Sequence, residues 1–156
     1  MRVLFLSQIV PYPPHGGVLQ RGYNVIRQLG QHAEVHLLAF VHPEALPTPE
    51  TLAESRVELS RFCRSVEYFP IWAKKSAAHK VLALSVSVVS GQPFGAIAHR
   101  SAAFRQRIEA VVRQQPFDIV HVDTIGLAGF VDLDAPPAAT VLTHHNIESM
   151  LMARRA

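Results

Sequence analysis

Short apolar runs alternate with helical patterns along this chain, and that alternation constrains its fold more than any other feature. The first run, Arg2–Ser7, is almost continuously apolar, as expected of a parallel strand covered by helices on both faces. A loop rich in proline and glycine leads into residues 18–29, whose apolar side chains recur at near-helical spacing, and residues 34–40 form the next apolar run. Connections of this length join parallel strands, so the sequence predicts β-α-β units.

The same alternation continues toward the end of the chain. Thr48, Pro49 and Glu50 are typical of a helix start, with a hydroxyl cap, a proline at the first position and an acid in the first turn. Ser101 is the expected cap of a helix that ends before Pro116, and Gly30 is the expected cap at the end of helix 18–29. Further strands are predicted at residues 65–69, 118–123 and 139–143, and further helical segments at 72–91, at 124–131 and from Asn146 onward.

The predicted fold class is therefore α/β, a doubly wound, mostly parallel, Rossmann-like sheet. A length of 156 residues fits one domain, and 49% hydrophobic with 17% charged residues excludes intrinsic disorder. Cys63 is the one cysteine, so an internal disulfide and a cysteine-based zinc site are excluded and a reducing, cytoplasmic location is expected. The net charge of +3 comes from no basic block, and we expect no nucleic-acid partner.

Ligands of such sheets bind at the carboxyl ends of the strands. Gly16 and Gly17 precede a helix start, where backbone amides bind anions, although a tight turn that only feeds the helix explains them about as well. Arg21, one turn into that helix, is a candidate anion partner, and a solvated helix residue is the alternative.

Two further strand ends carry polar side chains. His121 and Asp123 lie two apart on one strand and so face the same side, with Asp123 expected to be the better exposed. Asp123 is interpreted as a proton acceptor, as a ligand of sugar hydroxyls, or as a helix cap, while a buried, hydrogen-bonded side chain suits His121 better. After the last strand, His144 and His145 diverge in direction and lack the spacing of a helical zinc site, so no metal is expected; Asn146 and Glu148 are typical of a helix start.

Residues 72–89, which begin with Trp72 and end with Val89, combine lysines with an apolar run. Core packing is the first interpretation, and peripheral contact with an anionic membrane surface is the second. The apolar run 81–89 is far shorter than the roughly 20 residues of a membrane-spanning helix.

Taken together, residues 3–7 (VLFLS), the loop 11–17 (PYPPHGG), Arg21 and Tyr23 resemble the N-terminal domain of family 4 glycosyltransferases of the GT-B fold. Residues 117–123 (FDIVHVD) look like that family's D-V-V-H strand, and residues 143–149 (THHNIES) look like its H-N-x-E stretch. The resemblance covers the chain end to end, in the same order. Many relatives carry a second histidine where Asp123 stands.

The resemblance implies one half of a two-domain retaining enzyme that moves a sugar from a nucleotide-sugar, its co-substrate, to a saccharide or glycolipid acceptor without a metal or other cofactor. Gly16 and Gly17 would then face the donor phosphates and Asp123 would be catalytic. The acceptor or sugar would contact Arg21, His121, His144, His145, Asn146 and Glu148. Residues 1–156 would be the acceptor-side domain, cut before its last helix and the donor domain, in cell-surface polysaccharide assembly at the inner membrane face. A stand-alone saccharide or nucleotide binding module is the alternative.

Overall fold

The sheet has five strands, all parallel, in a computed structural model that describes residues 1–74, 76–92, 94–132 and 134–143. The strand order is β3-β2-β1-β4-β5, which places β1 at the centre, as its apolar sequence predicts. The strands are β1 (Arg2–Ser7), β2 (Glu34–Val41), β3 (Ser65–Pro70), β4 (Ile119–Val122) and β5 (Ala139–Leu142).

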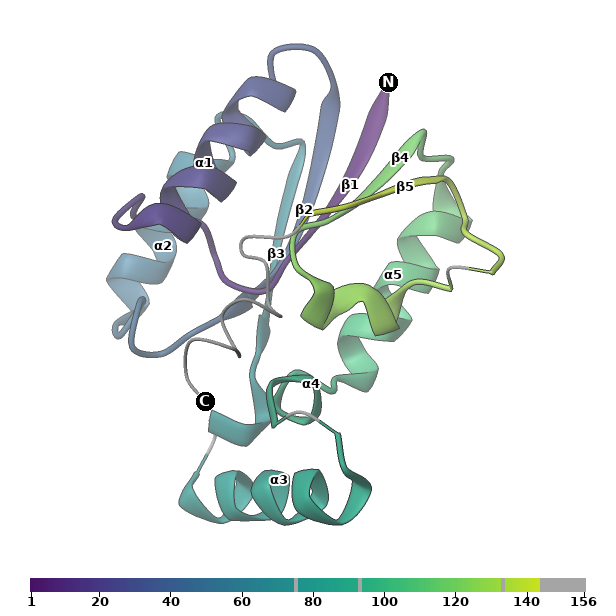
Figure 1. The fold of residues 1–156 in the computed structure, drawn as a ribbon. Helices are drawn as coiled ribbons and strands as arrows, with labels where there is room; N and C mark the ends of the chain where they lie inside the picture. The colour runs from purple at the N-terminus through teal and green to yellow at the C-terminus, as the bar shows by residue number, and fades with distance from the viewer. Residues whose placement is uncertain (75, 93, 133, 144–156) are drawn as a thin grey trace.

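Helices cover both faces of this sheet. Figure 1 shows α1 and α2 on one face and α5 on the other, so the prediction of a doubly wound α/β fold is confirmed. The helices are α1 (Gly17–Leu29), α2 (Pro49–Leu59), α3 (Ala77–Ser90), α4 (Phe94–Ala98) and α5 (Ala102–Gln114), with short 3-10 turns η1 (Trp72–Lys74) and η2 (Ile125–Phe130).

The core consists of two apolar clusters, one on each face of the sheet. Phe5 packs with Ile26 of α1 and Leu59 of α2, whereas the neighbouring residues Leu4 and Leu6 pack with side chains of α4, α5 and η2. Successive residues of β1 therefore point to opposite faces, and both faces are buried. This explains why the strand is apolar at every position instead of at every second one.

Helix caps fall where the sequence places them. The hydroxyl of Thr48 accepts a hydrogen bond from the Thr51 amide, and that of Ser101 accepts one from the Phe104 amide. The helical segment predicted at 72–91 is confirmed for α3, with η1 as a separate 3-10 turn before it. The short helix predicted at 124–131 is a 3-10 helix over residues 125–130. The sequence analysis missed α4, which has only five residues.

Gly30 is the C-cap of α1, as the sequence predicts, but its backbone is not left-handed. Its φ is −63°, a right-handed conformation open to any residue. A Cβ atom at this position would instead overlap the backbone carbonyl of Phe62, well inside van der Waals contact. Close approach of two chain segments, and not backbone conformation, therefore requires glycine here.

Candidate functional site

The strand order reverses at the carboxyl ends of β1 and β4. The chain runs outward from β1 through β2 to β3, then returns to the other side of β1 to add β4 and β5. Open α/β sheets bind their ligands in the crevice that such a reversal creates. The loop after β1 and the residues after β4 therefore form the candidate site.

The glycine pair Gly16 and Gly17 lies between this loop and α1. Gly16 has a φ of +80°, which favours glycine, and a Cβ atom on either Gly16 or Gly17 would meet no heavy atom within 4 Å. Hydroxyl side chains cap α2, α3 and α5, but α1 has no side-chain cap and no acid in its first turn. The amides of that turn therefore remain open to an anion more than those of the other long helices.

Asp123 lies at the end of β4, and the expectation that it is better exposed than His121 is wrong. Its amide donates to the Leu6 carbonyl, which extends the ladder with β1 and holds the residue inside the fold, where it is 3% exposed. One carboxylate oxygen accepts a hydrogen bond from the Ser7 hydroxyl at 3.5 Å and lies beside Gly22 of α1. The N-cap position of η2 is Thr124 and not Asp123, and no side-chain hydrogen bond caps this turn.

His121 lies on the same face of β4, as its spacing from Asp123 predicts, with 4.0 Å between its Nε2 and a carboxylate oxygen of Asp123. Its ring stacks on Phe5 with centroids 4.3 Å apart, and Nε2 is 3.1 Å from the Thr143 hydroxyl. Burial, aided by the positive charge of Arg21, lowers the pKa of His121 to about 4. The predicted hydrogen bond of His121 is confirmed, but the side chain is only partly buried, with 13% of it exposed. At neutral pH the ring is uncharged.

This depressed pKa predicts a loss of stability in acid. The unfolded chain binds a proton near the ordinary value of 6.5 and the folded chain only near 4, so the contribution of a neutral His121 is present above pH 6.5 and is lost as the pH falls toward 4. Between these values we expect His121 to lower the free energy of unfolding by about 2 kcal/mol, after a discount for partial exposure. Urea unfolding of wild type and His121→Gln at several pH values measures how much His121 contributes to the pH dependence of the free energy of unfolding. In the variant, the free energy of unfolding should fall less steeply with falling pH, because only other groups then titrate. The same steepness in both proteins would contradict the lowered pKa of His121.

Gln8 connects the loops that surround the site. Its side-chain oxygen accepts a hydrogen bond from the Thr124 hydroxyl at 2.8 Å, and its backbone carbonyl accepts one from Nε2 of His42 at 3.2 Å. The same side chain lies against Gly126 of η2. Gln8 therefore joins the segments that follow β1, β2 and β4.

A second polar cluster lies beside the site and was missed by the sequence analysis. Lys74 donates to Nδ1 of His42 at 3.3 Å and to the Glu44 carboxylate at 2.5 Å. His99 donates through Nδ1 to the Gly95 carbonyl, and its buried Nε2 has no hydrogen-bond partner. Burial lowers the pKa of both histidines. His42 directly follows β2, so the rule that selected Asp123 applies to it as well, whereas His99 directly follows the unpredicted α4.

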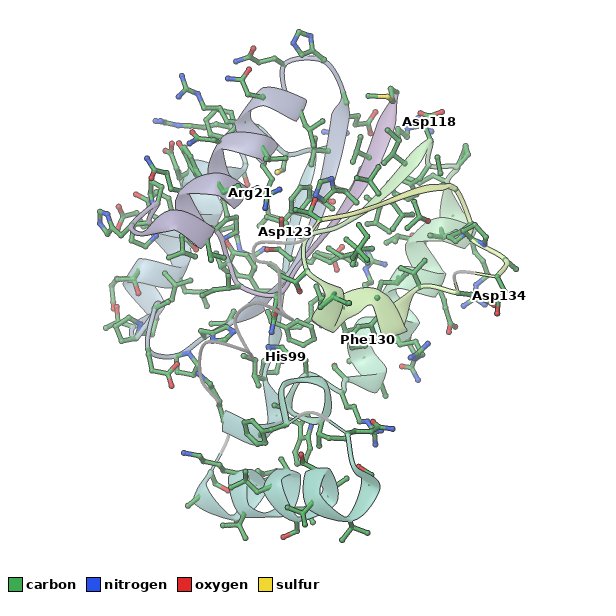
Figure 2. The ribbon with its side chains drawn as sticks, viewed as in Figure 1. Arg21, His99, Asp118, Asp123, Phe130 and Asp134 are labelled. Carbon is green, nitrogen blue, oxygen red and sulfur yellow. The ribbon has the colours of Figure 1, made fainter. Side chains whose placement is uncertain are left out.

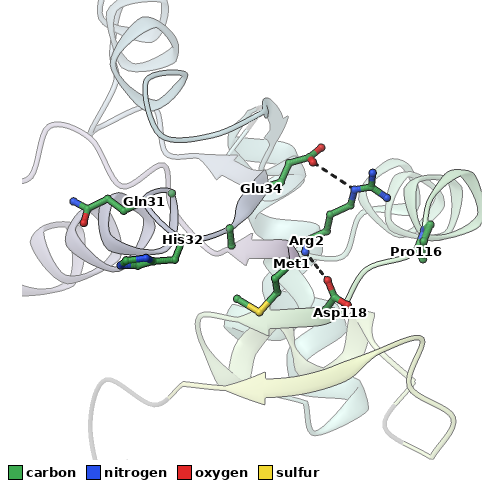
Figure 3. Close-up of a pocket in the computed structure, with 9 residues that line it drawn as sticks. Met1, Arg2, Gln31, His32, Glu34, Pro116 and Asp118 are labelled. Carbon is green, nitrogen blue, oxygen red and sulfur yellow. Dashed lines mark hydrogen bonds and ion pairs between the residues drawn. The ribbon is translucent and has the colours of Figure 1, made fainter.

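A depression of about 730 Å³ lies at the opposite, amino edge of the sheet (Figure 3). Its polar groups bond to one another: the Arg2 amide donates to Asp118 at 2.6 Å, and the Arg2 guanidinium lies 3.5 Å from Glu34. Open α/β sheets do not use this edge for ligands. Residues at the amino edge therefore serve as controls for residues at the carboxyl edge in any test of ligand binding.

The structure brings together Arg21, His121 and Asp123 on the α1 side of the β1 and β4 ends, and Gly16 and Gly17 lie at the amino end of the same helix α1; Figure 2 shows Arg21 on α1 and Asp123 at the end of β4. The candidates His144, His145, Asn146 and Glu148 lie outside the described residues. Within the described part of the chain, no three His, Cys, Asp or Glu side chains are grouped to hold a metal ion. No family model, curated protein or solved structure matches the chain.

Proposed function

We propose that this chain is the acceptor-side domain of a retaining, GT-B type glycosyltransferase of family 4. One observation carries the proposal: a cation, a neutral histidine and a carboxylate converge at the point where the strand order reverses, and the helix that supplies the cation begins at an open glycine pair. A nucleotide-sugar donor presents phosphates, and a saccharide or glycolipid acceptor presents hydroxyls. The converging groups match both kinds of ligand.

Each group has a task in such a transfer. The amides at Gly16 and Gly17 stabilise the nucleotide phosphate as it departs, and Arg21 adds positive charge on the same side. His121, uncharged near pH 7, exchanges hydrogen bonds with an acceptor hydroxyl. Asp123 holds that hydroxyl or accepts its proton, so that it is aligned with the anomeric carbon of the donor.

His144, His145, Asn146 and Glu148 complete the sugar-binding side in this proposal, as the family resemblance implies. Donor recognition belongs to a second domain of the enzyme, and the reaction takes place on the cytoplasmic side, in polysaccharide or glycolipid assembly. No metal or other cofactor takes part in this proposed mechanism.

Replacing Gly17 by valine tests the phosphate role. Because the space around Gly17 is open, the fold should tolerate the side chain, but the side chain would keep phosphate oxygens from the amides. We expect transfer by the full-length protein to fall at least about tenfold, with the thermal midpoint within about 2 °C of wild type. Gly129→Val is the matched control, because Gly129 is also surrounded by open space. Equal turnover in the two variants would contradict the proposed role.

A binding module that works without chemistry is the second candidate, and the burial of Asp123 favours it. A carboxylate that is 3% exposed is shielded from an acceptor hydroxyl unless α1 or the loop after β4 moves. The two candidates differ in donor turnover. A full-length protein that binds saccharide and hydrolyses or transfers no sugar from any nucleotide-sugar would favour the binding module.

A further inference from the structure

Helix α3 presents its apolar side to solvent. It lies at one end of the molecule, beyond the carboxyl edge of the sheet, and packs against η1 and α4 through Ala83 (Figure 1). The side chains on the opposite face are large and apolar, with Val88 82% exposed and Val89 88% exposed. Val81, Leu82 and Leu84 are exposed as well. This pattern is the reverse of a helix that packs its apolar face on a core and turns its polar face to water.

The serines of α3 do not make this face polar. The Ser85 hydroxyl donates to the Val81 carbonyl at 3.1 Å, and the Ser90 hydroxyl donates to the Val86 carbonyl at 2.6 Å. The Ser87 hydroxyl donates to the Gln92 carbonyl at 2.6 Å. Serine hydroxyls bonded to backbone carbonyls in this way need no water, so the face can enter an apolar environment without leaving a donor unpaired.

The segment of the chain that contains α3 has no acidic residue. No Asp or Glu occurs between Glu67 and Glu109, whereas Lys74, Lys75, Lys80 and Arg100 flank or lie within α3. Glu44 pairs with Lys74 and Glu67 pairs with Arg107. Lys80 is exposed on α3 itself. An apolar face bordered by cations is complementary to a surface that is apolar inside and anionic at its rim.

We propose that the exposed face of α3 docks on the surface of a bilayer that contains anionic lipid. The helix has 14 residues, and no helix within the described residues is long and apolar enough to span a membrane, so α3 would lie in the plane of the interface. A second copy of the chain fits this face less well, because two α3 segments brought together would oppose cations without an intervening acid.

The docking surface is narrower than the segment 72–89 that the sequence indicates. The Trp72 indole nitrogen donates to the Ile97 carbonyl at 2.9 Å, and the ring packs against the core. Trp72 therefore anchors α4 inside the protein and does not reach the bilayer. The exposed side chains Val81, Leu82, Leu84, Val88 and Val89 carry the contact.

Co-sedimentation with lipid vesicles tests the proposal independently of any sugar transfer. The chain should partition onto phosphatidylcholine vesicles that contain phosphatidylglycerol, and less onto pure phosphatidylcholine or at high salt. Val88→Glu should weaken partition at least about tenfold, and Val88→Leu should preserve it. Val57→Glu is the matched control, because Val57 of α2 is 68% exposed and the change in charge is the same. It should alter partition less than about twofold.

Three results would overturn docking on anionic lipid. The first is no partition onto either vesicle, and the second is equal partition onto both. The third is a wild-type chain that sediments as a dimer and becomes monomeric in Val88→Glu without any vesicle binding, which would identify the face as an interface between copies. Circular dichroism of Val88→Glu and Val57→Glu verifies that both variants remain folded.

Discussion

Replacement of Asp123 by asparagine is expected to lower sugar transfer by the full-length protein about 100-fold. The amide has almost the shape of the carboxylate and can still meet the Ser7 hydroxyl, so the packing beside Gly22 is preserved. It cannot accept a proton, and it carries no negative charge toward His121 or a bound hydroxyl. The expected loss is therefore in kcat more than in KM. Initial rates with a labelled nucleotide-sugar, over a range of acceptor concentrations, measure both.

Asp118→Asn is the matched control for this experiment. Asp118 immediately precedes β4 at its other end and bonds to the Arg2 amide at the amino edge, far from the proposed chemistry. We expect this variant to transfer sugar at a rate within about twofold of wild type. Wild-type rates in Asp123→Asn would limit Asp123 to a structural role and remove it from the catalytic assignment.

Gly30→Ala is expected to destabilise the fold by about 3 kcal/mol. A backbone carbonyl cannot turn aside as a flexible side chain does, so the new methyl group must separate α1 from the Phe62 segment. Helix propensity acts in the opposite direction, because alanine is favoured over glycine by about 1 kcal/mol in a helix. The sign of the measured change therefore decides between overlap and propensity. Chemical denaturation of the two proteins gives the difference directly.

Gly95→Ala separates the two effects. Gly95 lies in α4, and a Cβ atom there would meet nothing within 4 Å. We expect this variant to be as stable as wild type or slightly more stable, since only propensity changes. A Gly30→Ala protein that is also as stable as wild type would show that the Phe62 segment gives way at little cost.

The sheet and its long helices could be predicted because local signals and packing agree in them. Apolar β1 is buried on both faces, and Thr48 and Ser101 cap the helices that they precede. The environment of Asp123 could not be predicted in this way. Its exposure depends on how closely α1 approaches β4 at Gly22, which is a tertiary contact that alternation of apolar and polar residues does not encode.

The second polar cluster shows another limit of sequence reasoning. His42 and His99 are 57 residues apart and come together only because the five-residue α4 returns to the end of β2. A helix that short carries too few residues for a periodic pattern. The polar end of β2 was nonetheless visible in the sequence, and a consistent search of every strand end would have found His42.

Amide chemical-shift mapping of the full-length protein, which holds the proposed donor-recognition domain, during titration with UDP-glucose and GDP-mannose tests most directly whether the ligand site lies at the carboxyl edge. We predict that the resonances of Gln8, Gly16, Gly17, Asp123 and Thr124 shift together and saturate with at least one of the two ligands. Those of Arg2, Glu34 and Asp118, at the amino edge, should remain in place. Shifts confined to the amino edge, or no saturable shift with either ligand, would contradict a nucleotide-sugar site between β1 and β4.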